Sequence, residues 1–75
     1  MKIKEICGGS IALKLEKELE IDRVLAIFEN YEIVFKSKDS AKVKKNGKEA
    51  MIFSYGEIVF TNFTKEEIMK IAKKL

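Results

Sequence analysis

Apolar and polar residues alternate along much of this chain, and residues 50–61 show the alternation most clearly. Two runs rich in β-branched and aromatic residues flank the Ser-Tyr-Gly at residues 54–56, which predicts a β-hairpin. Because side chains alternate between the faces of a strand, Ile52 points away from the face that holds Met51 and Phe53. Both faces of the hairpin are therefore largely apolar. A chain of 75 residues builds one core, so we expect a partner chain, a ligand or a nucleic-acid groove to cover the second face.

Two more strands are predicted directly before this hairpin. In the first of them, Tyr31, Ile33 and Phe35 are expected to share one face. Residues 41–45 alternate again and form the second strand. The Asn-Gly pair at residues 46–47 predicts a type I′ turn, which joins this strand to the hairpin.

The chain also contains one earlier strand and two helices. Residues 3–15 predict a long first strand, and the Gly-Gly-Ser at residues 8–10 indicates a β-bulge that bends it. Apolar residues at helical spacing predict a short helix over residues 21–28. Thr64 and Glu67 form a capping box, which predicts the start of a last helix.

The resulting order is β-α-β-β-β-β-α in a single α+β domain that spans residues 1–75. It predicts a curved antiparallel sheet of about five strands, with both helices packed on one face of that sheet. The opposite face of the sheet is then left open. This open face is where we expect the function of the chain to reside.

Composition restricts the chemistry that the chain can perform. There is no histidine and one cysteine, Cys7, which we expect to be a packed apolar residue. The sequence shows no metal-ligand cluster and no paired catalytic carboxylates, so we expect no enzyme, no metal and no cofactor. No signal peptide or membrane-spanning segment is evident, which predicts a cytoplasmic protein without membrane contact. The high Lys and Glu content is typical of heat-adapted proteins.

Positive charge is concentrated in one part of the chain. Residues 36–48 contain six lysines and one aspartate, whereas the formal net charge of the whole chain is +3. Lys42 and Lys44 are expected on one face of a strand beside the apolar hairpin. Two interpretations remain open. The lysines keep a strand edge soluble, or they contact the phosphates of a nucleic acid.

The order of elements and several segments resemble one half of the saddle of the TATA-box-binding protein family. Ala50-Met-Ile-Phe-Ser-Tyr-Gly-Glu-Ile-Val-Phe-Thr resembles the family's strand pair Ala-Leu-Ile-Phe-x-Ser-Gly-Lys-x-Val-x-Thr. Leu19-Glu-Ile-Asp-Arg-Val-Leu-Ala is similar to its helix Leu-Asp-Leu-Glu-Lys-Val-Ala. The likeness spans nearly the whole chain, and the hairpin is its most specific part. Members of the family carry two such repeats, whereas this chain has one.

The resemblance implies a concave sheet face that contacts the minor groove of duplex DNA. Phe53 matches a phenylalanine that wedges between base steps in the family. Lysines in the basic region would then contact phosphates. The implied nucleic-acid-binding residues are Phe53, Met51, Val59, Thr61, Lys42, Lys44, Lys36 and Lys38.

A single repeat needs a second copy to complete such a saddle. The resemblance therefore implies a homodimer through the first strand, over residues 3–15. The implied dimer interface consists of Ile3, Ile6, Ile11 and Leu13.

The chain also departs from the family pattern. Glu5 or its neighbour stands where the family has an asparagine at the centre of the groove, and Glu57 replaces a lysine. The family's proline-containing wedge loop has no counterpart, although Phe35 lies close to its position. These departures favour an alternative function, namely a protein-interaction or assembly module whose open face is covered by another chain. A small apolar ligand held between helix and sheet is a third hypothesis.

Overall fold

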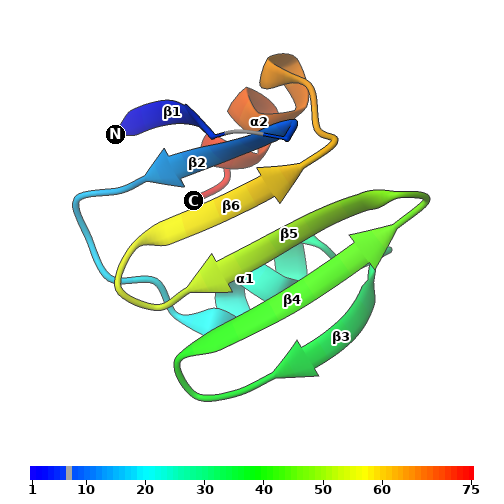
Figure 1. Cartoon of the computed structure of the whole chain (residues 1–75). Coiled ribbons are helices and arrows are strands. Elements are labelled where there is room, and N and C mark those ends of the chain that lie inside the picture. The colour runs from blue at the N-terminus through cyan, green and yellow to red at the C-terminus, as the bar shows by residue number, and fades with distance from the viewer. Residues whose placement is uncertain (7) are drawn as a thin grey trace.

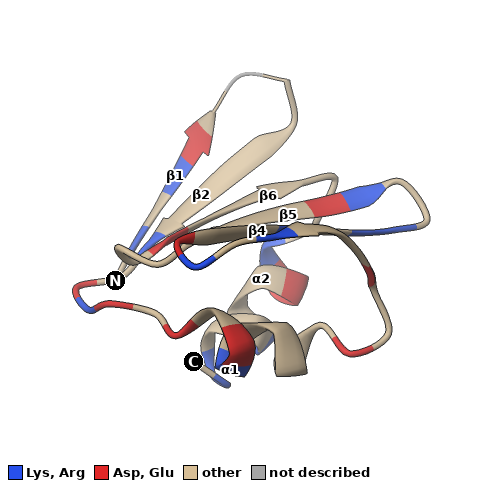
Figure 2. Cartoon of the chain, turned by 90° about the horizontal axis from the view of Figure 1, so that it is seen from below, with Lys and Arg blue, Asp and Glu red and all other residues tan. Residues whose placement is uncertain are grey.

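The structure is a computed structural model that describes residues 1–6 and 8–75. In the described residues, six antiparallel strands form one open sheet with the order β1-β2-β6-β5-β4-β3 (Figure 1). Two helices lie on the same side of this sheet (Figure 2). The elements are β1 (Lys2–Ile6), β2 (Ser10–Lys14), α1 (Ile21–Ile27), β3 (Glu32–Lys36), β4 (Ser40–Lys45), β5 (Lys48–Phe53), β6 (Glu57–Thr61) and α2 (Lys65–Ala72).

This architecture confirms the expected α+β fold with two helices on one face of a curved sheet. The two hairpins of the second half also form as expected. Asn46 and Gly47 both have positive φ, 49° and 81°, as the turn between β4 and β5 requires. The capping box is present, because the Thr64 hydroxyl accepts from Glu67 N and the Glu67 carboxylate accepts from Thr64 N.

The prediction of one long first strand was wrong. β1 and β2 are separate strands that pair antiparallel, with Ile6 opposite Ser10. Gly8 and Gly9 have φ values of 81° and 79° and lie in the connection between them. A bulge and a tight turn both use glycine at positive φ, so the glycines alone do not distinguish the two. The sheet consequently has six strands instead of about five. The expected packing of Cys7 lies outside the described residues.

A bulge does occur in the sheet, but in β3. The register with β4 shifts between Ile33 and Phe35, so Ile33 lies opposite Val43 and Phe35 opposite Lys42. Since Val43 and Lys42 point to opposite faces of β4, Ile33 and Phe35 also face opposite sides. The expectation that they share a face was therefore wrong, because one extra residue reverses the alternation.

The core fills the space between the sheet and the two helices. Val24 and Phe28 of α1 and Ile68 of α2 pack there against the sheet. Lys48 at the start of β5 bonds the Glu67 carboxylate on the same side, which lowers the pKa of Glu67 and raises that of Lys48. The sheet residues that are fully buried on this helix face include Leu13, Val43, Ile52, Ile58 and Phe60.

The connection between β2 and α1 is hydrogen-bonded to the β5–β6 turn. Leu15 N donates to Gly56 O at 2.7 Å, and Leu19 N donates to Ser54 O at 2.8 Å. Gly56 has φ +115°, and a Cβ atom there would lie 2.4 Å from the carbonyl oxygen of Lys17. Glycine is therefore required at this turn both for its conformation and for the close approach of the connection.

Candidate nucleic-acid interface

The candidate site is the face of the sheet opposite the helices, which we call the open face. Its centre is built by β5 and β6, whose hairpin register places Met51 opposite Val59 and Phe53 opposite Glu57. Met51, Phe53 and Val59 are half-buried, whereas their neighbours along each strand are buried against the helices. The alternation expected in this hairpin is therefore present. The apolar residues on its second face remain accessible to a partner.

Thr61 lies on the same face at the other end of β6. It is opposite Glu49 on β5 and opposite Ser10 on β2. The hydroxyls of Ser10 and Thr61 are 3.0 Å apart and hydrogen-bonded. The four apolar and hydroxyl residues that the sequence assigned to a groove contact thus share one surface.

Lysines lie on both sides of this apolar centre. Lys42 is opposite Met51, and Lys44 is opposite Glu49, so both point to the open face from β4. On the far side of the centre, Ala12 of β2 is opposite Val59 and pairs in turn with Lys4 of β1. Strands β4 and β2 are three strand spacings apart, which corresponds to roughly 14 Å.

Three of the open-face lysines were not identified from the sequence. Lys14 is opposite Glu57, and Lys2 is opposite Lys14, so both join Lys4 on this surface. Their position follows from the pairing of β1 with β2 and of β2 with β6. The lysines are visible in the sequence, but the Gly-Gly-Ser pattern predicts a bulge where the turn that brings them to this face occurs.

Acidic residues also lie on the open face. The Lys42 ammonium is 3.6 Å from the Glu49 carboxylate, and both side chains are substantially exposed. An exposed pair of this kind contributes at most about 1 kcal/mol and is readily exchanged for another anion. The Tyr55 hydroxyl donates to the Glu57 carboxylate at 2.7 Å, and this bond raises the pKa of Tyr55.

Tyr55 extends the aromatic part of the site. Its ring stacks on Phe53 with a centroid separation of 5.4 Å and an interplanar angle of 29°. Tyr55 is 65% exposed and belongs to the turn between β5 and β6. The sequence predicts Tyr55 only as a turn residue, because a residue in a turn has no predictable face.

Phe35 is also on this surface. It lies opposite Lys42 at the β3 edge of the sheet and is 41% exposed. The bulge in β3 turns it to the open face. Its role as a second wedge remains a prediction.

Two of the expected phosphate-binding lysines are placed differently. Lys36 is opposite Ala41, on the helix face, and its ammonium lies 2.5 Å from the Asp22 carboxylate of α1. It therefore does not share a surface with Phe53, because the β3 bulge reverses the alternation. Lys38 is exposed in the connection between β3 and β4. The structure brings Lys42 and Lys44, but not Lys36, to the open face.

The residues expected at a dimer interface also separate into two groups. Leu13 is 0% exposed and belongs to the core of its own chain, so it has no surface to offer to a second copy. Ile11 is opposite Phe60, on the helix face, and packs against the same core. Ile3 and Ile6 are exposed on β1. The expected contact through all four residues is corrected by this placement, because β2 is an internal strand covered by β1.

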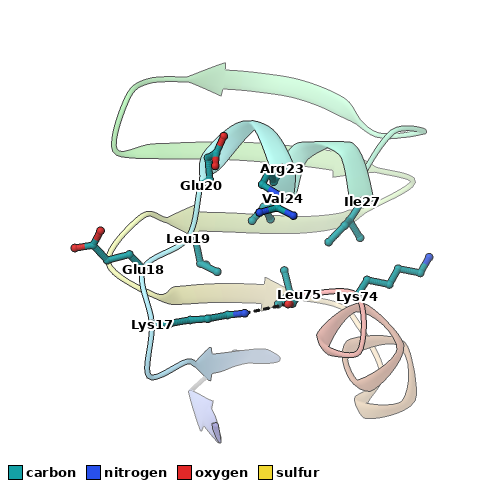
Figure 3. A pocket seen from close by; sticks show the side chains of 9 residues that line it. All are labelled: Lys17, Glu18, Leu19, Glu20, Arg23, Val24, Ile27, Lys74 and Leu75. Atoms are coloured by element: carbon teal, nitrogen blue, oxygen red, sulfur yellow. Dashed lines mark hydrogen bonds between the residues drawn. The ribbon is translucent and has the colours of Figure 1, made fainter.

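A surface hollow of about 480 Å³ lies on the helix side, beside α1 and the end of the described chain (Figure 3). Lys17 donates to the Leu75 carbonyl oxygen at 3.0 Å across it. Charged residues of both signs line the hollow, including Glu20 and Arg23. It opens to solvent, and the core residues Leu19 and Val24 are among its lining residues. This setting does not resemble the enclosed apolar site that a small apolar ligand would need.

Two further findings concern the described residues only. In residues 1–6 and 8–75, no three side chains of histidine, aspartate, glutamate or cysteine gather into a group able to hold a metal ion. Within the same residues, neither helix has the length and apolar character needed to cross a membrane.

The chain matches no family model, no curated protein and no solved structure. The open face and the residues that carry the resemblance to the TATA-box-binding protein family are therefore the features that bear on its function.

Proposed function

We propose that this chain is a small cytoplasmic module, similar to one half of the TATA-box-binding protein, that binds duplex nucleic acid through its open face. The observation that carries the proposal is the arrangement of that face. An apolar centre of Met51, Phe53 and Val59 lies between lysines of β4 on one side and lysines of β1 and β2 on the other.

The spacing of the lysines suits a duplex groove. The minor groove is about 6 Å wide and is bordered by two phosphate backbones. Lysines on strands roughly 14 Å apart can each reach one of these backbones, since their side chains are long and flexible. The apolar centre then meets the base edges, where minor-groove proteins commonly insert Phe, Met or similar side chains.

The acids of the open face set the expected strength of this binding. Glu49 and Glu57 would face the nucleic acid and weaken its attraction. Lys42 can exchange its exposed Glu49 contact for a phosphate at small cost. We therefore expect modest affinity with a clear dependence on salt, carried by a few phosphate contacts.

The first test is fluorescence anisotropy with labelled AT-rich and GC-rich duplexes at several salt concentrations. We expect affinity to fall with salt and to favour the AT-rich duplex. Lys42→Ala/Lys44→Ala removes two cations from the open face and should reduce the slope of log K against log salt by about 2. The matched control is Lys70→Ala/Lys74→Ala, which removes the same charge outside the open face.

Each outcome of this titration has a clear meaning. Equal binding of the two duplexes supports recognition of duplex shape without reading of the minor groove. If the control variant lowers the slope as much as Lys42→Ala/Lys44→Ala does, the binding is nonspecific attraction to a basic protein. Absence of binding to either duplex at low salt would overturn the proposal.

A second candidate function is protein assembly through the same face. The observation that favours it is the cluster of Phe53, Tyr55 and Glu57, in which the exposed Tyr55 ring stacks on the half-buried Phe53 beside a carboxylate. Tyrosine and phenylalanine are enriched at protein interfaces. A stable, salt-insensitive complex that is lost on Met51→Ala/Phe53→Ala, together with no duplex binding, would favour this function.

A further inference from the structure

The two edges of the sheet differ in how they are protected. Within the described part of the chain, β1 and β3 are the outermost strands, and each has a neighbouring strand on one side only (Figure 1). An unpaired edge offers free backbone N–H and C=O groups, and proteins commonly guard such edges with charged residues. β1 is guarded in this way, because it reads Lys-Ile-Lys-Glu-Ile.

β3 lacks this protection at its centre. Ile33, Val34 and Phe35 are three consecutive apolar residues, and they are 51%, 45% and 41% exposed. The bulge leaves Val34 without an opposite residue on β4. A consecutive apolar stretch on a free sheet edge is a ready site for pairing with another strand.

The charges at the ends of this strand have opposite signs. Glu29 and Glu32 lie at or just before its start, and Lys36 and Lys38 lie at or just after its end. All four side chains are exposed. The edge therefore runs from acidic through apolar to basic along the direction of the chain.

We propose that β3 is a self-association edge, at which the β3 strand of a second copy pairs antiparallel about a two-fold axis near Val34. Antiparallel pairing brings the acidic end of each strand beside the basic end of the other, and it does so twice because of the symmetry. Parallel pairing would place like charges together, which is unfavourable. The charge pattern thus selects a second copy in one orientation over an arbitrary extended peptide.

The same reasoning disfavours a dimer through β1. An antiparallel two-fold pairing centred on that strand places Lys4 opposite the Lys4 of the second copy. Like charges opposite each other destabilise a strand pair. The two edges therefore have different roles: β1 prevents association and β3 permits it.

Pairing at β3 has a defined consequence for the open face. Glu32 is opposite Lys44, and Phe35 is opposite Lys42, so both point to the open face. A register that keeps the open faces of the two copies on one side places Glu32 opposite the Phe35 of the second copy. The two six-stranded sheets then form one continuous surface, with Lys42 of each copy near its middle. Pairing at the β3 edge does not require nucleic-acid binding.

The first test is sedimentation equilibrium of the whole chain without nucleic acid, over a range of protein concentrations. We expect a concentration-dependent species with twice the mass of one chain. Val34→Lys places a charge in the centre of the β3 edge and should weaken association about tenfold or more. Ile3→Lys is the matched control at the β1 edge and should leave association unchanged. A monomer at all concentrations, or a dimer that is sensitive to Ile3→Lys and not to Val34→Lys, would overturn the proposal.

The second test reverses charges at exposed positions, and one of the changes, Lys36→Glu, also removes the ion pair between Lys36 and Asp22. Glu29→Lys/Glu32→Lys makes the edge wholly basic, and Lys36→Glu/Lys38→Glu makes it wholly acidic. We expect each variant to be monomeric alone, and an equimolar mixture to form a heterodimer. All four residues are exposed, so the substitutions should not unfold the chain. If mixing restores association, misfolding of the single variants cannot explain their monomeric state.

A charge-matched control accompanies the mixture. Glu16→Lys/Glu18→Lys and Lys70→Glu/Lys74→Glu carry the same changes in net charge at sites away from β3. Both of these variants should dimerise like the unaltered chain, with no gain on mixing. If the two β3 variants remain monomeric when mixed, or if each dimerises alone, the antiparallel β3 pairing is incorrect. Duplex binding by an unaltered chain that stays monomeric at all concentrations would leave the proposed function intact while the edge proposal fails.

Discussion

The two faces of the sheet are built by the same alternating strands but differ in how deeply their apolar side chains are buried. On the helix face, Ile58 and Phe60 of β6 are fully buried beneath α1 and α2. On the open face, Val59 lies between them in sequence and remains half-exposed. Both faces are apolar at their centre, yet the chain supplies cover for only one. The apolar residues of the helix face therefore contribute to stability, whereas those of the open face remain partly exposed to solvent.

The largest expected effect is on stability, and it tests whether the two faces contribute unequally to the free energy of unfolding. Phe60→Ala removes a ring that contacts both Phe28 and Phe63 in the core, and should lower the free energy of unfolding by about 3–5 kcal/mol. Phe53→Ala, on the other face, should cost about half as much or less, because its ring is only partly removed from water. Urea denaturation of both variants measures the difference. Equal losses would remove the distinction between the faces.

The second effect tests the open face in binding. Phe53→Ala should weaken duplex affinity about tenfold, close to 1.4 kcal/mol, because the ring is then absent from the groove contact. Anisotropy titration at fixed salt gives this value. Met69→Ala, which removes an exposed apolar side chain from α2, is the control and should leave affinity unchanged. An unchanged affinity for Phe53→Ala would separate the apolar centre from nucleic-acid binding.

A smaller effect concerns the helix that covers the helix face. Thr64→Ala removes the side-chain cap of α2 and should lower the free energy of unfolding by about 1 kcal/mol. Thr64→Ser keeps the hydroxyl and should recover most of the loss. Thermal or urea denaturation of the two variants distinguishes capping from packing of the threonine methyl group. A cap contribution well below that of the Phe60 ring would show that packing dominates the helix face.

The smallest expected effect depends on pH. The Lys48 ammonium and the Thr64 N–H hold the pKa of Glu67 below its ordinary value of 4.5. A lowered folded pKa stabilises the fold fully above the unfolded value, and this contribution is lost as the pH falls through the folded value. The melting temperature of Glu67→Gln should therefore lie below that of the unaltered chain at neutral pH, and the difference should shrink in acid. Glu66→Gln is the control. A difference in melting temperature between Glu67→Gln and the unaltered chain that widens in acid would contradict this account.

Local signals in the sequence are sufficient to predict the second half of the fold. Asn46-Gly47 and the Thr64–Glu67 capping box are short patterns whose geometry is decided by neighbouring residues, and both form as predicted. The alternation in β5 and β6 likewise fixes which residues share a face. The alternation pattern alone therefore groups the central residues of the candidate site, which are Met51, Phe53, Val59 and Thr61.

The parts that the sequence did not predict depend on pairing between distant segments. Gly8 and Gly9 are compatible with a bulge or a turn, and the choice depends on whether β1 pairs with β2. The missed lysines Lys2, Lys4 and Lys14 follow from that pairing. The bulge in β3 was also not predictable from local sequence, because no glycine marks it. It nevertheless exchanges the sheet faces to which Phe35 and Lys36 point. Such non-local choices are settled by the packing of the whole sheet.

The pairing of β2 with β6 also determines when the chain can fold during synthesis. These strands are neighbours in the sheet, and the intervening residues include α1 and three other strands. Contacts between segments so far apart in sequence form slowly, because a long loop must close first. On a ribosome, β1 and β2 emerge early but cannot join the sheet until β6 has been made. Until then they exist only as a two-stranded hairpin, a form that is marginally stable in water.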